Sequence, residues 1–353
     1  GRPGATSMGV WARTATAGEF YVRYGTDAGD LDLATAMVTT KLENDCTGWI
    51  ELKGLKPATR YHFAVVTEGQ KNPPPKGTFR TLQSSKAVKD PKLNPKGLFN
   101  FSFEFACGNN QSPANGIGYS LPTYTTMLRE ISDKVDFAIL NGDWLYEEKR
   151  EYPASDWLKQ VGATPEQNPR LVELAPTITG VWENYKLYLS RAPNLAEWHS
   201  RVPTYYTFDD HELLNDIWGA GSPGFRNRRA VFRDIGVRAW YDYLGWSNPE
   251  PFKQEAHFGR ARLTGGSGIL VDPEADFTKH DWKQAANLHV HWGTDTAGVH
   301  DNALDGVGGD PNAGTYDVVD VLDKHRLRIS PPVKKSGVQS YSIGRLSYGK
   351  FRV

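Results

Sequence analysis

Two short segments of the chain place metal-binding side chains directly after an apolar run. Asn141-Gly142-Asp143-Trp144-Leu145-Tyr146 follows residues 135–140, and Asp209-Asp210-His211-Glu212 follows residues 202–208. Such a run predicts a buried strand, and a strand of an α/β sheet delivers the residues after it to the edge where these sheets bind ligands. Carboxylates gathered at one edge repel one another unless cations neutralise them. The two segments therefore predict a site for more than one metal ion.

Two further residues bear on which metals such a site would hold. Cys107 follows a third predicted strand, residues 98–106, and Tyr146 lies three residues after Asp143, so one turn could aim both at one ion. A carboxylate suits hard cations and can bridge two of them. A phenol, with a pKa of about 10, loses its proton only beside a strong Lewis acid such as ferric iron. A thiolate favours a transition metal over Mg²⁺.

Each of these residues also has an ordinary structural interpretation, which the sequence leaves open. Cys107 could be a small buried hydrophobe, Asp143 a helix cap, and Tyr146 a core residue with its hydroxyl bonded to the backbone. His289 and His291 would share one face of a strand, a familiar arrangement for a metal pair. They lie in a segment of low periodicity, so we expect a structural role for them.

The composition limits the classes of protein that the chain can belong to. Its 353 residues suffice for two domains, and Lys plus Arg equals Asp plus Glu at 41 each, so no bulk charge points to nucleic acid or a membrane surface. No apolar stretch approaches the roughly 18 residues that a membrane helix needs. Cys46 and Cys107 are too few for a disulfide scaffold, although a bridge between them stays open.

The N-terminal residues 1–84 predict a β-sandwich. Short alternating runs rich in aromatic and β-branched residues are separated by turns. Residues 55–61 (LKPATRY) resemble the turn of fibronectin type III modules in which a tyrosine at the start of a strand caps a corner of the sandwich. The polar residues 85–97, rich in lysine and proline, predict a linker.

From residue 98 onward the pattern predicts an α/β domain that extends to residue 353. Residues 98–106, 124–135 and 135–140 form a strand–helix–strand unit, which indicates parallel neighbouring strands. Residues 181–191 and 226–244 predict helices. Residues 263–335 are rich in Gly, Asp and Pro with little periodicity, and they predict a long ordered loop or insertion. Residues 341–353 alternate again, as a strand of the same domain would.

The order of the motifs F-x-F-A-C-G, N-G-D-W-L-Y-E and D-D-H-E-L-L-N-D resembles the PhoD-like alkaline phosphatases, a branch of the calcineurin-like metallophosphoesterases. The resemblance covers most of the chain, including an N-terminal sandwich of the kind that the family carries. It implies a layered α/β/β/α domain that hydrolyses small-molecule phosphate monoesters or diesters with ferric iron and calcium. Because family members are exported, it also implies a secreted or periplasmic protein.

The resemblance further implies roles for individual residues. Cys107 and Tyr146 would bind iron, and Asp143 would be the carboxylate that bridges metals. Asp210 stands where related enzymes have a metal-binding Asn, and Asp209 would be a further ligand.

Two more residues receive roles from the same resemblance. His211 lies where the family's acid, or phosphate-oxygen donor, is expected, so that His211 and Asp210 are the expected catalytic residues. Asn215 would bind calcium or contact the phosphate.

One departure from the family concerns the end of the chain. The family carries a further metal-binding motif of the G-D-x-H kind after a strand containing L-D-T-R, and residues 341–353 resemble the strand just before it. We therefore expect an incomplete catalytic domain with an unpaired sheet edge, whose partner is a C-terminal fragment of the same protein bound as a second chain.

Two functions from different classes remain. The first is a metal-dependent phosphoesterase, and the alternative is a secreted binding or adhesion protein with a vestigial phosphatase domain. Ligands at three strand ends argue against decay, because a site without metal would keep its carboxylate repulsion. A nuclease would share the chemistry, but the balanced charge lacks the basic footprint of nucleic-acid binding.

Overall fold

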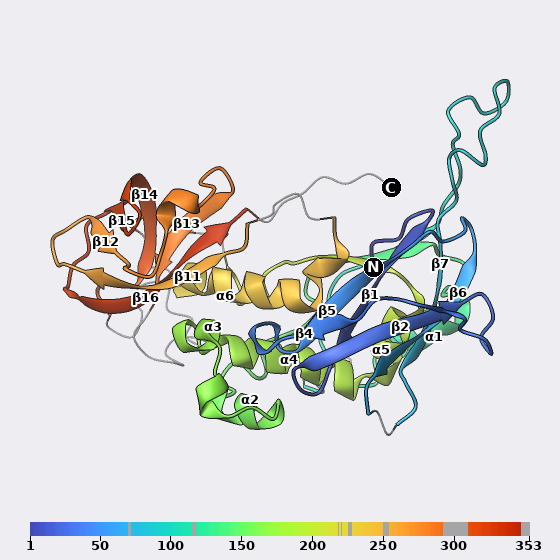
Figure 1. The fold of residues 1–353 in the computed structure, drawn as a ribbon, viewed down its shortest axis with the longest axis horizontal. Helices are drawn as coiled ribbons and strands as arrows, with labels where there is room; N and C mark the ends of the chain where they lie inside the picture. Colours follow the sequence, from blue (N-terminus) through green and yellow to red (C-terminus); the bar gives the residue numbers. More distant parts are fainter. Residues whose placement is uncertain are drawn as a thin grey trace.

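The computed structural model describes residues 1–69, 72–114, 118–217, 219, 221–224, 228–249, 254–291 and 310–346. The N-terminal sheets lie at one end of the long axis, a strand barrel lies at the other, and helices of an α/β region lie between them (Figure 1). Within these ranges, no helix combines the length and the apolar character that crossing a membrane requires.

The N-terminal region consists of two antiparallel sheets that share one core. Its strands are β1 (Ser7–Arg13), β2 (Gly18–Gly25), β3 (Leu33–Ala34), β4 (Val38–Thr40), β5 (Thr47–Lys53), β6 (Arg60–Thr67) and β7 (Lys76–Arg80). β1 pairs with β5, while β3, β2, β6 and β7 form the other sheet with β4 on β2. Phe20, Val22 and Phe79 are among the buried residues between them. The Tyr61 hydroxyl accepts the backbone N–H of Lys56 at 2.9 Å, which is the corner contact that residues 55–61 predict.

The α/β region is built on a three-stranded parallel sheet in the order β10-β9-β8. The strands are β8 (Phe103–Ala106), β9 (Phe137–Asn141) and β10 (Thr204–Thr207). The helices are α1 (Pro122–Glu130), α2 (Ala154–Gln160), α3 (Arg170–Leu174), α4 (Ile178–Arg191), α5 (Pro193–Arg201) and α6 (Arg228–Tyr243). The predicted strand–helix–strand unit and the helices at α4 and α6 are confirmed, whereas α2, α3 and α5 were not predicted.

The two faces of this sheet are covered unequally. On one face Ala138, Leu140 and Tyr206 belong to the large core that the helices complete. The other face carries a small cluster around Phe137, and Phe103 and Phe105 of β8 are 50% and 59% exposed. Since the described residues supply a single sheet here, the four-layer arrangement that the resemblance implies is not present among them.

A closed antiparallel barrel follows α6, where a long loop was expected over residues 263–335. Its strands are β11 (His257–Leu263), β12 (Ile269–Val271), β13 (Ala285–Val290), β14 (Gly314–Asp323), β15 (Arg326–Ser330) and β16 (Gly337–Arg345). They close in the order β11-β12-β15-β14-β13-β16 around a core that includes Leu270, Leu288 and Leu327. The loop prediction is wrong for the described part of this segment; residues 292–309 lie outside it.

The expectation for residues 341–353 is also wrong where the structure describes them. β16 is a barrel strand that pairs with β11 on one side and β13 on the other, so it offers no unpaired edge to the α/β sheet. Residues 347–353 lie outside the described ranges. The alternation of this segment was correctly interpreted as a strand, but sequence alone could not identify its partners.

A buried aspartate ties the N-terminal sheets to the helices. Asp45, with no solvent exposure, accepts hydrogen bonds from Arg13 Nε at 3.0 Å and from Trp157 Nε1 at 2.7 Å. It also accepts a hydrogen bond from the Tyr243 hydroxyl, and Lys186 Nζ lies 3.5 Å away. These partners come from β1, α2, α6 and α4, so the network fixes the N-terminal sheets against the α/β region.

Candidate metal centre

The ends of two neighbouring parallel strands form the site. Thr207, the last residue of β10, is in register with Asn141, the last residue of β9, so the loops that follow leave the sheet side by side. Gly142 has a φ of 89°, and a Cβ at this position would lie 2.4 Å from the backbone nitrogen of Asp209. Glycine is required here because it both adopts this backbone conformation and lets the two loops touch.

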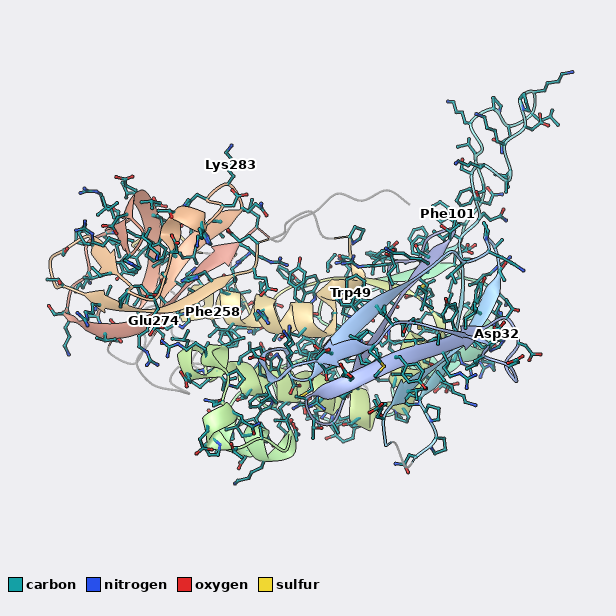
Figure 2. The ribbon with its side chains drawn as sticks, in the orientation of Figure 1. Asp32, Trp49, Phe101, Phe258, Glu274 and Lys283 are labelled. Carbon is teal, nitrogen blue, oxygen red and sulfur yellow. The ribbon has the colours of Figure 1, made fainter. Side chains whose placement is uncertain are left out.

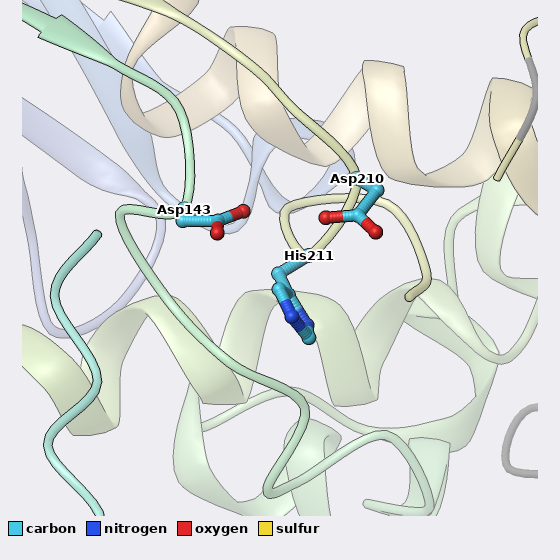
Figure 3. Close-up of side chains that lie close together, drawn as sticks. All are labelled: Asp143, Asp210 and His211. Carbon is cyan, nitrogen blue, oxygen red and sulfur yellow. The ribbon is translucent and has the colours of Figure 1, made fainter. Parts of the chain in front are cut away.

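Three side chains from these loops converge. Asp143, Asp210 and His211 each offer a donor atom within 4.8 Å of the others, and the two carboxylates point toward one another (Figure 3). Asp143 itself has a φ of 54°, a conformation that Asp tolerates better than most residues. Its carbonyl accepts the backbone N–H of Asn109 at 2.7 Å, which ties this strained residue to the loop after β8.

The donor set fits a cation. Asp143 Oδ1 is buried and has no hydrogen-bond partner among the described residues, while Oδ2 accepts the Tyr146 hydroxyl at 3.2 Å. Leaving a buried carboxylate oxygen without a partner is costly, and a cation would satisfy it. Two carboxylates with one imidazole are also a donor set that divalent and transition metals accept.

The pKa values of three acidic groups around this point are raised. Burial and the negative charge of Asp210 raise the pKa of Asp143. Burial and Asp143 raise the pKa of Tyr146, and the same two causes raise the pKa of Cys107. A bound cation reverses this effect, because it favours the anionic form of each neighbouring ligand.

His211 is held by a carboxylate from the first loop. Its Nδ1 lies 2.7 Å from Glu147 Oε2, while Glu147 Oε1 accepts the backbone N–H of Asn215 at 2.5 Å. Burial alone would lower the pKa of His211, but the hydrogen bond and charge of Glu147 raise it. The engaged Nδ1 leaves Nε2 as the ring nitrogen that can face a ligand or hold a proton.

A second carboxylate, that of Glu212, connects the two loops through hydrogen bonds. Glu212 is fully buried; its Oε1 accepts the Trp144 backbone N–H at 2.6 Å and its Oε2 accepts that of Asp209 at 3.1 Å. Burial raises the pKa of Glu212 to about 7. The guanidinium of buried Arg150 donates to the His211 carbonyl at 2.7 Å, and this hydrogen bond also holds the loop that follows β10.

The other predicted site residues lie around this triad. Tyr146 contacts Asp143 through its hydroxyl, and its ring centroid is 4.1 Å from that of His211. Cys107 is an exposed free thiol, and it lies outside the triad together with Asp209. Asn215 donates its side-chain amide to Asp216 Oδ2 at 3.2 Å.

Sequence reasoning assigned no role to Glu147 or Arg150, and it placed Glu212 among the carboxylates of the sheet edge without an individual role. Glu147 and Glu212 stand inside the two motifs, directly beside Tyr146 and His211, so their position was a signal that could have identified them. Nothing in the spacing marks Arg150, because its contact with the second loop forms only in the folded chain.

The histidine pair of β13 lies in a separate group, here called the α6–barrel cluster: Asp234, His289, His291 and Ser342. His289 Nδ1 lies 2.8 Å from Asp234 Oδ2, and the Ser342 hydroxyl donates to the same oxygen at 2.8 Å. His291 Nε2 lies 3.0 Å from Ser342 Oγ, and Arg233 donates to Asp234 Oδ1 at 2.9 Å. The pair therefore has the structural role that we expected, joining the barrel to α6.

Comparison with known proteins finds a matching family model and similar solved structures. Residues 101–264 match the family model described as PhoD-like phosphatase. A solved structure of PhoD has a TM-score of 0.51 at 18% identity, over 75% of this chain and 48% of that chain. The chain thus spans about half the length of that structure, and the likeness shows the fold.

Another solved structure matches more weakly. Purple acid phosphatase PPD1 from yellow lupin (Lupinus luteus) seeds has a TM-score of 0.39 at 12% identity, over 72% of this chain and 41% of that chain. No curated protein sequence matches the chain.

Proposed function

We propose that this chain, whose residues 101–264 match the PhoD-like phosphatase family model, is a metal-dependent phosphoesterase. The observation that carries the proposal is the convergence of Asp143, Asp210 and His211 at two strand ends, with one buried carboxylate oxygen left without a hydrogen bond. This arrangement is what a cation site needs before the cation binds. The vestigial alternative gives no reason to retain such an oxygen.

Asp143 and Asp210 would hold the cations, while His211 would keep its Nε2 for the donation of a proton. When bound, the cations would neutralise phosphate oxygens and lower the pKa of water, so that hydroxide is available to attack phosphorus at neutral pH. Ferric iron and calcium are the ions that the resemblance implies, with Cys107 and Tyr146 toward iron and with Asp209 and Asn215 as further ligands.

His211 serves as the proton donor in this proposal. Glu147 accepts at Nδ1 and keeps the ring in one orientation, so Nε2 can hold a proton toward the oxygen of the leaving group. Glu147 thus makes the catalytic orientation of His211 independent of the substrate.

The open face of the sheet supports a further polypeptide partner. Phe103 and Phe105 are half exposed on β8, which pairs only with β9 among the described strands. Exposed neighbouring aromatic residues of this kind mark an interaction surface. We propose that a segment of the same protein, as a second chain, covers this face and supplies the remaining ligands. The export of the protein stays a prediction.

Hydrolysis of phosphate esters tests the proposed function. Asp143→Asn and Asp210→Asn should each lower the hydrolysis of p-nitrophenyl phosphate and of bis-p-nitrophenyl phosphate on the order of 10³-fold, because a metal contributes several kcal/mol of transition-state stabilisation. Asp320→Asn, which changes an exposed carboxylate on β14, is the matched control and should leave both rates unchanged.

Two results would reject the phosphoesterase. Variants at Asp143 and Asp210 that hydrolyse both esters as fast as the parent would show that the triad is not the reaction centre. A parent protein that binds the metals but hydrolyses neither ester would favour the binding or adhesion protein. The ratio of the two parent rates would assign the monoester or diester preference.

A further inference from the structure

A cleft separate from the metal triad lies between the N-terminal sheets and the α/β region. It has a volume of about 760 Å³. One wall comes from β1, β6 and β7, and the other comes from α4, α5, β10 and residues 243–246. This volume falls within the roughly 300–1,000 Å³ of small-molecule sites, and boundaries between domains are a common place for them.

The walls of the cleft are mainly apolar and aromatic. Trp11, Phe63, Phe79, Trp144 and Val202 contribute to them. No aspartate or glutamate is among the lining residues, so the cleft offers no carboxylate to a cationic ligand. This composition favours an apolar molecule.

Three of the cations that line the cleft are paired within the protein. Arg13 binds Asp45 at 3.0 Å, Lys186 lies 3.1 Å from Glu183 and 3.5 Å from Asp45, and Arg201 pairs with Glu197. Since these three charges are neutralised by residues of the protein, they offer little to an anion. A ligand without charge suits it best.

His199 adds a polar group to the cleft but no charge. Its Nε2 accepts the indole N–H of Trp144 at 3.1 Å, so Nδ1 carries the proton toward the Tyr206 hydroxyl at 2.9 Å. Burial lowers the pKa of His199 to about 3, which keeps the ring neutral at physiological pH. Both ring nitrogens are therefore engaged, and they hold the Trp144 side chain in the wall.

Trp144 links the cleft to the metal triad through the backbone. It directly follows Asp143, and its N–H is held by Glu212 at 2.6 Å. We propose that the cleft binds a neutral, mainly apolar small molecule that packs against the partly exposed rings of Trp11 and Phe63, beside the wall that the buried Trp144 completes. A ligand in this position lies beside Trp144, which follows the candidate metal ligand Asp143 in the chain, without occupying the triad itself.

Titration with the neutral dye N-phenyl-1-naphthylamine tests this inference. The proposal predicts saturable dye fluorescence with one site per chain. Ala196→Phe on α5 and Ser190→Trp on α4, which place large side chains in the cleft, should each weaken binding at least about tenfold. Ala36→Phe, an exposed change of the same kind outside the cleft, is the matched control.

Two further measurements keep the test decisive. Hydrogen exchange on the unmodified chain should show dye protection at Pro193–Arg201 and Lys76–Arg80, even if a filled variant fails to fold. Phe105→Ser removes an aromatic ring from the open face of the sheet and should leave dye binding unchanged.

Loss of dye binding in Phe105→Ser, with full binding in Ala196→Phe and Ser190→Trp, would place the dye on β8 and overturn the inference. Non-saturable binding to the parent would also overturn it. Because the readout is dye fluorescence, neither result depends on phosphoesterase activity, and failure of the proposed function would leave it unaffected.

Discussion

The candidate metal triad (Asp143, Asp210 and His211) and the α6–barrel cluster both contain aspartate and histidine, but they differ in burial and in hydrogen bonding. Asp143, Asp210 and His211 are partly exposed, and one buried oxygen of Asp143 has no hydrogen-bond partner among the described residues. Asp234 and His289 are fully enclosed, and both oxygens of Asp234 accept hydrogen bonds.

The pKa shifts of the two aspartates follow the same contrast. Burial raises the pKa of Asp143, and Asp210 adds to that rise. Burial also acts on Asp234, but His289 and Arg233 outweigh it and lower its pKa to about 2. Residue type thus identifies neither group as functional; the difference is whether the protein itself supplies the counter-charge.

The largest effect that would sharpen this comparison is loss of folding stability in Asp234→Asn. The change leaves Arg233 and His289 without their buried anion, and breaking such a group costs about 3–5 kcal/mol. Urea denaturation should show this decrease in the free energy of unfolding, against a change below about 0.5 kcal/mol in Asp320→Asn. A loss below about 1 kcal/mol in Asp234→Asn would refute the structural role.

The next effect concerns the carboxylate that orients His211. Glu147→Gln keeps the shape of the side chain but removes its charge, and the loss of such a supporting carboxylate costs about 10–100-fold in metal affinity or activity. Glu147→Asp should recover part of the activity because it restores the charge. Glu148→Gln, beside it in the chain but paired with Arg191, serves as the control. Equal activity in Glu147→Gln and Glu148→Gln would contradict this role.

The pH dependence of stability separates the two groups further. The pKa of Asp234 is lowered from 3.8 to about 2 on folding, so its ionised form stabilises the protein above about pH 4. This contribution, about 2 kcal/mol, is lost as the pH falls through 2. The difference in unfolding free energy between the parent and Asp234→Asn should therefore shrink from neutral pH to about pH 2. A constant difference over that interval would argue against the charge of Asp234 as the cause.

The smallest effect is the one that Asp143→Asn should have on the metal-free protein. The pKa of Asp143 is raised on folding. Its ionised form therefore lowers the free energy of unfolding at neutral pH. Asp143→Asn should leave the unfolding free energy of the chelator-treated protein unchanged or higher by up to about 1 kcal/mol. Thermal unfolding with and without metal measures this. A clear destabilisation of the metal-free protein would give Asp143 a structural role instead.

The sequence predicted the edge of the α/β sheet because short runs that are mainly apolar or aromatic end at polar motifs. Residues 137–141 and 204–207 are strands, and the carboxylates follow them. The contributions of Glu147, Glu212 and Arg150 depend on contacts between loops more than 60 residues apart in the chain, which spacing does not reveal.

Register shifts between its strands explain why the sequence did not predict the barrel. The pairing of β14 with β15 shifts register between Val318 and Asp320 and again between Val321 and Asp323, and β13 shifts between Ala285 and Leu288. Each irregularity moves later side chains to the opposite face, so the two-residue period that identifies a strand is interrupted. Sequence reasoning therefore found low periodicity in a segment whose described residues contain the barrel strands β12, β13, β14 and β15.

Metal analysis of the protein purified without chelators tests the central claim most directly. We expect bound metal, with iron near one equivalent together with calcium, in the parent and in Asp234→Asn, and loss of this metal in Asp143→Asn. Equal metal in the parent and in Asp143→Asn, or no metal in the parent after incubation with both ions, would contradict it.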